Sequence, residues 1–215
     1  MFDLDGVLID SEGAWNEARR EVALAHGGRW SDDAQRAMMG MSSTEWSAYM
    51  HDELGVHLAA GQISERVVDG LLARYRRHLP LLPGGVEAVD ALSRAWPLGL
   101  ASSANRSVIE LVLSLSGLAG RFAATVSSEE VERGKPAPDV YVEAAWLLEV
   151  PADECVAVED SGNGIRSAVA AEMQVIAVPN REFPPSAADL DLADDVLSSL
   201  EELDRARVEW VAAGT

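Results

Sequence analysis

The chain has 215 residues, of which 48% are hydrophobic, so it can bury the core of one large domain or of one domain with a substantial insertion. Its formal net charge of −19 disfavours nucleic acids and anionic membranes as partners, because both need a basic surface. No run approaches the ~18 apolar residues of a membrane span, no basic signal-peptide segment opens the chain, and the single Cys155 cannot form an internal disulfide. We therefore expect a soluble, cytoplasmic, monomeric protein.

The first predicted element is a short strand in MFDLDGVLID. Asp3 and Asp5 end this strand, one residue apart and directly behind Met1 and Phe2. The position of the two acids makes them candidates for a functional site.

The next segment is predicted to be helical throughout. Its basic and acidic residues nearly balance, whereas the rest of the chain is strongly acidic. In SERVVDGLLARYRRHL (64–79) the apolar residues recur at helical spacing behind Ser64, a candidate N-cap. The stretch LPLLPGG (79–85) is typical of a linker. We predict a helical cap domain at residues 13–82, inserted into a core domain formed by residues 1–12 and 83–215.

Short apolar runs alternate with longer amphipathic stretches after residue 84. The runs are LGLAS (98–102), AATVS (123–127), CVAVE (155–159) and VIAVP (175–179). Strands that alternate with helices indicate βαβ units and a mostly parallel sheet. The predicted fold class is therefore α/β, with a Rossmann-like doubly wound parallel sheet core and an inserted all-helical cap.

Polar residues collect at the ends of these predicted strands, where parallel sheets bind their ligands. They are Asp3, Asp5, Ser102, Lys135, Glu159 and Asp160. Crowded carboxylates need a hard cation between them, and carboxylate oxygens suit Mg²⁺. Lys135, the only lysine of the chain, adds an ammonium, and Ser102 adds a hydroxyl. Both groups can donate hydrogen bonds to an anion. This combination favours a Mg²⁺-dependent phosphoryl-transfer site.

Four segments carry a resemblance to a known family. DLDGVLIDS, LASS, GKPAPD and VEDSGNGI resemble, in order, the four motifs of the haloacid dehalogenase (HAD) superfamily. The helical insertion after the first strand is similar to that of the group containing β-phosphoglucomutase and many small-molecule phosphatases. Only Met1 and Phe2 precede the first aspartate, fewer than is usual in this family, so we expect either an upstream start or a weakened sheet.

The resemblance implies a role for each matching residue. Asp3 would be the nucleophile that forms an aspartyl-phosphate, and Asp5 would be the general acid and base. The implied phosphate ligands are Ser102, Ser103 and Lys135. The implied Mg²⁺ ligands are Asp3, the Asp5 backbone carbonyl and Asp160, with Glu159 nearby. In the cap, Trp15, Met41, Ser42 and Ser43 are candidates for substrate specificity.

The expected substrate is a small phosphorylated metabolite, and two other functions remain open. A sugar-phosphate mutase has a phosphate-binding arginine where the GMSS segment (40–43) carries Ser43, which favours hydrolysis here. The fold could supply another arginine to the site, from the set Arg19, Arg20, Arg74, Arg76 and Arg77. A phospho-receiver signalling domain shares some of these residue types, but it is near ~120 residues, within one ordinary domain, and has no helical insertion.

Overall fold

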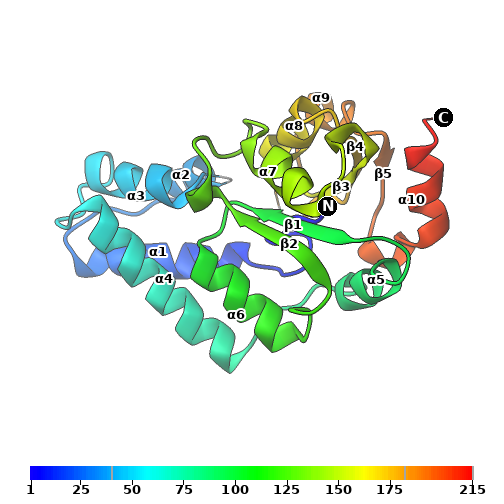
Figure 1. Ribbon diagram of the computed structural model, residues 1–215. Helices are drawn as coiled ribbons and strands as arrows, with labels where there is room; N and C mark the ends of the chain where they lie inside the picture. The colour runs from blue at the N-terminus through cyan, green and yellow to red at the C-terminus, as the bar shows by residue number, and fades with distance from the viewer. Residues whose placement is uncertain (40, 182, 215) are drawn as a thin grey trace.

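The computed structural model describes residues 1–39, 41–181 and 183–214, so Gly40 of the GMSS segment lies outside the described residues. The chain folds into a parallel β-sheet with helices on both faces and a group of helices at one end (Figure 1). The strands are β1 (Leu98–Ser102), β2 (Phe122–Ser127), β3 (Val156–Glu159), β4 (Gln174–Ala177) and β5 (Asp195–Val196).

The N-terminal residues join two halves of this sheet. Strand β1 pairs with β2, and β3 pairs with β4 and β4 with β5, all in parallel. Phe2 forms parallel bridges to Leu100 of β1 and to Val158 of β3. The strand order is therefore β2, β1, residues 1–3, β3, β4, β5, and the first segment is the central strand.

The central strand is as short as the sequence indicates. The Phe2 N–H donates to Gly99 O at 2.8 Å and the Ala101 N–H donates to Phe2 O at 2.9 Å. On the other side, the terminal amine of Met1 donates to Val156 O at 2.7 Å. Residues 1–3 therefore pair with Gly99 and Ala101 on one side and with Val156 and Val158 on the other.

Alternating residues of the strands face two different layers, as a doubly wound sheet requires. Phe2, Leu100, Val158 and Ile176 pack into one buried cluster, and their neighbours pack into a second. The first cluster contains side chains of α5 (Gly85–Leu92), α6 (Arg106–Ser116) and α10 (Arg205–Ala212). The second contains side chains of α7 (Asp139–Leu148) and α8 (Gly162–Ala170). The predicted α/β fold class is confirmed.

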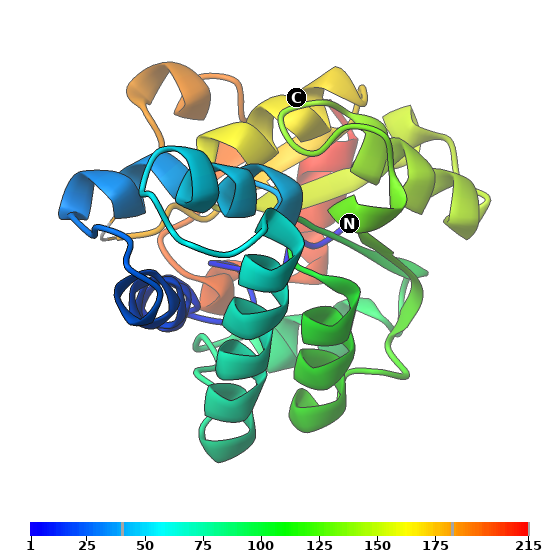
Figure 2. The same ribbon diagram turned by 90° about the vertical axis from the view of Figure 1, so that its left-hand side faces the viewer.

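The inserted segment consists of four helices in its described residues. These are α1 (Glu12–Ala25), α2 (Asp32–Met38), α3 (Ser43–Asp52) and α4 (Ala60–Arg77), which we call the cap helices. Helix α4 lies beside α6, as Figure 2 shows, and cap side chains such as Trp15 and Tyr75 belong to the same buried cluster as Phe2. The cap helices therefore share a continuous apolar core with one face of the sheet.

The expected N-cap at Ser64 is wrong. The N-cap of helix α4 is Ala59, five residues earlier, and its N–H donates to the side chain of Gln62 at 3.2 Å. That side chain satisfies a backbone donor at the helix start, so no serine is needed there.

The remaining elements are one short α-helix and three 3₁₀ helices. They are α9 (Ala187–Leu190) and the 3₁₀ helices η1 (Ser128–Glu130), η2 (Ala152–Glu154) and η3 (Leu200–Glu202). Among the described residues, no helix is long and apolar enough to cross a membrane. The exact limits of the two domains stay a prediction.

Candidate active site

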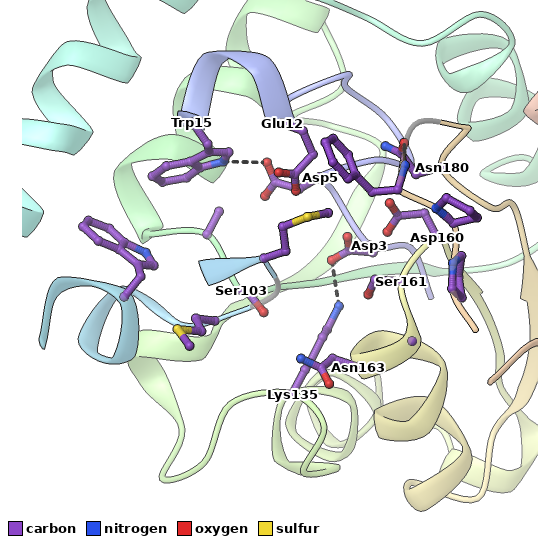
Figure 3. Close-up of a pocket in the computed structure, with 18 of the residues that line it drawn as sticks. Asp3, Asp5, Glu12, Trp15, Ser103, Lys135, Asp160, Ser161, Asn163 and Asn180 are labelled. Carbon is purple, nitrogen blue, oxygen red and sulfur yellow. Dashed lines mark hydrogen bonds and ion pairs between the residues drawn. The ribbon is translucent and has the colours of Figure 1, made fainter. Parts of the chain in front are cut away.

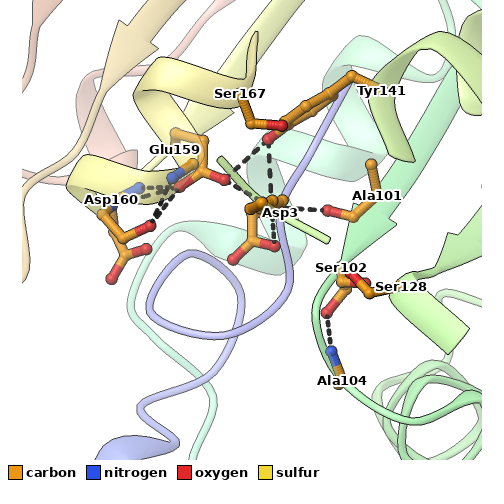
Figure 4. Close-up of polar contacts among 12 residues, drawn as sticks. Asp3, Ala101, Ser102, Ala104, Ser128, Tyr141, Glu159, Asp160 and Ser167 are labelled. Carbon is orange, nitrogen blue, oxygen red and sulfur yellow. Dashed lines mark hydrogen bonds and ion pairs between the residues drawn. The ribbon is translucent and has the colours of Figure 1, made fainter. Parts of the chain in front are cut away.

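Lys135 lies at the centre of the polar cluster at the carboxyl end of the sheet. Its Nζ lies 2.7 Å from Asp3 Oδ1 and 2.6 Å from Glu159 Oε1, and it donates to Ala101 O at 3.0 Å (Figure 4 shows these acceptors). The side chain is almost fully buried. Burial disfavours the Lys135 ammonium, but the carboxylates of Asp3 and Glu159 outweigh this effect and hold its pKa above the usual range. The lysine therefore remains a cation.

Glu159 is held entirely by protein groups. Its Oε1 also accepts from Tyr141 OH at 2.9 Å, and its Oε2 accepts from the N–H groups of Asp160 at 3.0 Å and Ser161 at 3.2 Å. A Cβ on Gly164 would lie 1.8 Å from Glu159 Oε1, so the glycine of the GNG segment leaves room for this carboxylate. Glu159 thus orients Lys135 and the following loop.

Three carboxylates meet at this point and could hold a metal ion. Asp3, Glu159 and Asp160 are buried. One carboxylate oxygen of each lies within 4.8 Å of one carboxylate oxygen of each of the other two. Burial raises the pKa of Asp3 to about 7, against the opposing effect of Lys135, and burial and Glu159 raise the pKa of Asp160 well above its usual range. A cation would remove this penalty, because it favours the ionised carboxylates.

Gly6 allows the approach of Asp160 to the first loop. Its φ is +78°, which favours glycine, and a Cβ there would lie 1.8 Å from Asp160 Oδ2. The sequence Asp-x-Asp-Gly therefore has a steric reason as well as a chemical one.

Asp5 lies beside this cluster with a different partner. Its Oδ1 accepts from Trp15 Nε1 at 3.0 Å, and it is half-buried, whereas Asp3 is buried (Figure 3). Both aspartates line a cavity of about 250 Å³ between the core and the cap helices. Two carboxylates in different environments at one cavity can perform different tasks.

The cavity has a core side with most of the polar residues and a cap side with two tryptophans, two methionines and two charged residues. Apart from the two aspartates, the core side is lined by Ser103, Ala104, Lys135, Asp160, Ser161, Gly162, Asn163, Arg166, Asn180, Phe183, Pro184 and Pro185. The cap side is lined by Glu12, Trp15, Arg19, Met39, Met41 and Trp46.

Several predicted residues lie away from the cavity. Ser102 is fully buried and its Oγ accepts from the Ala104 N–H at 3.0 Å, whereas Ser103 lines the cavity. Ser42 is the N-cap of α3, and Ser43 Oγ lies 3.4 Å from Glu129 Oε1. Neither lines the cavity, so their roles stay predictions.

The sequence named Arg19 only as one of five candidate arginines, and it did not predict that Glu12, Asn163, Arg166 and Asn180 also line the cavity. Of the five cap arginines considered above, all within the described residues, Arg19 alone is buried and lines the cavity. Arg74 pairs with Glu21 at 2.5 Å, and the other three are exposed. Arg19 follows Trp15 by four residues and therefore shares its helix face, a signal that could have identified it.

Comparison with known proteins places this site in a family. A family model described as haloacid dehalogenase-like hydrolase matches residues 1–178. The chain belongs to this family. Hexitol phosphatase B of Escherichia coli (strain K12) is 36% identical over 209 residues, which cover 94% of this chain and 92% of that protein. The expectation of a HAD-family enzyme is confirmed, and the phospho-receiver alternative is not supported.

Other HAD proteins include phosphatases and mutases. A phosphorylated carbohydrates phosphatase of Thermotoga maritima is 30% identical and covers 82% of each chain. CbbY from Rhodobacter sphaeroides, solved in complex with xylulose-(1,5)bisphosphate, has a TM-score of 0.86 and 25% identity, with 96% of each chain covered. The β-phosphoglucomutase of Clostridium difficile has a TM-score of 0.83 at 23% identity, which shows a common fold.

Proposed function

We propose that the protein is a Mg²⁺-dependent phosphatase that hydrolyses a small phosphorylated metabolite through an aspartyl-phosphate on Asp3. The observation that carries this proposal is the position of Asp3, which is held by Lys135, adjoins Asp160 and lines the same cavity as Asp5. A nucleophile, a candidate proton carrier and a cation thus meet around one small space.

Asp3 and Asp5 would divide the chemistry between them. A carboxylate oxygen of Asp3 attacks phosphorus, and the ester oxygen leaves with a proton from Asp5. Water then attacks the phosphorus of the aspartyl-phosphate while Asp5 accepts its proton, which releases inorganic phosphate and restores Asp3. Lys135 would neutralise charge on the phosphoryl oxygens throughout.

The carboxylates of Asp3 and Asp160 and the Asp5 carbonyl would hold Mg²⁺. Bound there, Mg²⁺ would supply positive charge between the carboxylates and the phosphoryl group. The buried acidic cluster supports this assignment, because burial raises the pKa of Asp3 and of Asp160 although Lys135 opposes both shifts, and a cation between them would favour the ionised carboxylates.

The volume of the cavity and the names of the related enzymes both favour a small substrate. About 250 Å³ is below the ~300–1,000 Å³ typical of sites for drug-sized ligands. The relatives include hexitol phosphatases, a pseudouridine-5'-phosphatase and a phosphatase of phosphorylated carbohydrates. A cytoplasmic location and a monomeric state stay predictions.

Substitution of the nucleophile tests this proposal. Asp3→Asn should abolish release of inorganic phosphate from p-nitrophenyl phosphate, because the amide cannot form the acyl phosphate. The matched control is Asp69→Asn, at an exposed position of α4, which should retain activity. Removal of metal with EDTA should abolish activity, and MgCl₂ should restore it. Parent activity in Asp3→Asn or in the stripped protein would contradict the mechanism.

Sugar-phosphate mutase activity is the second candidate, favoured by the position of Arg19. A mutase must hold a bisphosphate by its second phosphate, and Arg19 places a cation on the cap side of the cavity. We expect phosphate release from simple monophosphates and no conversion of β-glucose 1-phosphate to glucose 6-phosphate, even with glucose 1,6-bisphosphate as primer. Efficient primed conversion with little phosphate release would establish the mutase instead.

A further inference from the structure

Arg19 is a buried cation whose surroundings are mainly aromatic. It lies on α1 and is 6% exposed. Its guanidinium carbon is 4.9 Å from the ring centroid of Trp15 and 5.1 Å from that of Trp46. These contacts with two indole rings fix the side chain and exclude water, while the residue still lines the cavity.

One donor of this guanidinium has no acceptor. Arg19 Nε is buried and makes no hydrogen bond within the described residues. Burial lowers the pKa of Arg19 to about 10, and the carboxylates of Glu12 and Asp5 oppose that shift, so the group is charged at neutral pH. A buried donor on a charged group is costly unless it gains an acceptor. The neighbouring carboxylates favour the cation, and the residue as a whole still lines the cavity.

The cavity places this cation across from the phosphoryl chemistry. Asp3 and Lys135 belong to the core side, whereas Arg19, Trp15 and Trp46 belong to the cap side (Figure 3 labels Asp3, Lys135 and Trp15). A substrate with its transferred phosphate at Asp3 would reach Arg19 with its opposite end. Arginine binds planar or tetrahedral oxyanions with two parallel hydrogen bonds, which makes it suited to a second anionic group.

We propose that Arg19 determines substrate specificity by binding a second anionic group, a carboxylate or a phosphate, at the end of the substrate remote from the transferred phosphate. This inference rests on the proposed phosphatase function. It explains why an arginine rather than an apolar residue lies between two tryptophans on the cavity wall. The preferred substrates are then small phosphate esters that carry a carboxylate or a second phosphate at the remote end, and phosphate esters of equal length with an uncharged remote end are poorer ones.

Pairs of esters that differ at the remote end test this inference. The carboxylate pair is 3-phosphoglycerate and glycerol 3-phosphate, and the phosphate pair is glucose 1,6-bisphosphate and glucose 6-phosphate. The wild-type protein should have the higher kcat/KM for the first member of one pair. Arg19→Met should lower that ratio of kcat/KM values about ten- to a hundredfold, mainly through KM, because a charged hydrogen bond is lost. The pair that responds identifies the anion.

Two further variants separate recognition from folding. Arg20→Met removes the adjacent, exposed arginine of the same helix and should leave both ratios unchanged. Arg19→Lys keeps the charge without the planar fork and should restore part of the selectivity. Calorimetry in the Asp3→Asn background should show weaker binding of the anionic ester when Arg19→Met is added, which gives a measurement independent of turnover.

The outcomes distinguish this inference from the proposed function. If the wild-type protein hydrolyses p-nitrophenyl phosphate but Arg19→Met lowers activity on all esters equally, Arg19 is a structural cation and the inference fails. A wild-type preference for glycerol 3-phosphate and glucose 6-phosphate, whose remote ends are uncharged, also overturns it, because Arg19 would then bind hydroxyl groups. Absence of any ester hydrolysis would contradict the phosphatase function itself.

Discussion

At the scale of single residues, Lys135 shows why one lysine occurs in a chain that otherwise uses arginine. Its Nζ lies within 3.0 Å of acceptor atoms of Asp3, Ala101 and Glu159, and the space around it is closed. A planar guanidinium cannot place one nitrogen at the centre of these oxygens, because its charge spreads over a larger, rigid group. The site therefore requires a compact ammonium.

We predict that Lys135→Arg loses nearly as much activity as Lys135→Ala, although the arginine keeps the charge. The measurement is kcat with p-nitrophenyl phosphate at saturating Mg²⁺, with melting temperatures recorded to confirm that both variants fold. Activity of the Arg variant close to that of the wild-type protein would show that charge alone is sufficient at this position.

For Asp5→Asn we expect a loss of ~10²–10⁴ in kcat, the usual contribution of a positioned acid or base. The loss should be smaller for p-nitrophenyl phosphate than for an alkyl phosphate, because nitrophenolate leaves without a proton. The Trp15 Nε1 hydrogen bond to Asp5 indicates that a cap residue holds this carboxylate. Equal losses for the two esters would contradict the role of Asp5 as the acid.

Site residues that belong to a local sequence pattern can be predicted from the sequence. Site residues that only tertiary packing places at the cavity cannot. Asp3, Lys135 and Asp160 follow from strand ends and family motifs, and the structure brings them together. Arg19 and Trp46 come from different helices, and the spacing of residues within one helix does not place them at the same cavity. Their meeting depends on how α1 packs near α3, which one sequence does not specify.

At the scale of elements, strands β1 to β4 lie close to their predicted positions because short apolar runs between amphipathic helices specify them. Helix α4 begins before Ser64 because the helical apolar spacing extends further back, to Ile63, and its N-cap Ala59 offers no side-chain acceptor that the sequence would reveal. The central strand was correctly predicted to be short, and its length has an electrostatic consequence. Burial lowers the pKa of the Met1 amine to about 6.

We predict that three or four apolar residues added before Met1 raise the melting temperature, because they lengthen the central strand and move the amine into solvent. The gain should be larger at pH 6 than at pH 8. Between these values the unfolded chain holds a proton on the amine that the folded chain releases, so this group alone makes stability rise with pH. Asp3 has the opposite effect up to about pH 7, since its pKa is raised on folding.

The difference in melting temperature between the extended and the parent chain reports the effect of the amine alone, because the carboxylates contribute equally to both chains. A Gly-Ser-Gly extension is the matched control, since it moves the amine without adding strand residues that pack well. It should show the same pH dependence of the difference, because it also frees the amine, but give a smaller gain at pH 8. An unchanged melting temperature in the apolar extension would show that the three-residue strand is adequate.

At the scale of the whole molecule, the active-site cavity joins the cap helices to the core. Trp15 and Arg19 line it from the cap, and Asp3 and Lys135 line it from the core. The buried cluster also runs from the cap helices to one face of the sheet. A ligand in this cavity contacts both parts, so it should stabilise them together.

We predict that orthovanadate with MgCl₂ raises the melting temperature in one cooperative transition. A ligand at about 100 times its Kd adds ~2.7 kcal/mol to the free energy of unfolding. For a domain of this size that corresponds to ~5–10 °C. Calorimetry should show this shift in the wild-type protein and in Arg20→Met, and it should be lost in Lys135→Ala because the anion then faces uncompensated carboxylates. Two separate transitions, of which only one shifts with the ligand, would show that the cap helices unfold independently and that the cavity does not couple them to the core.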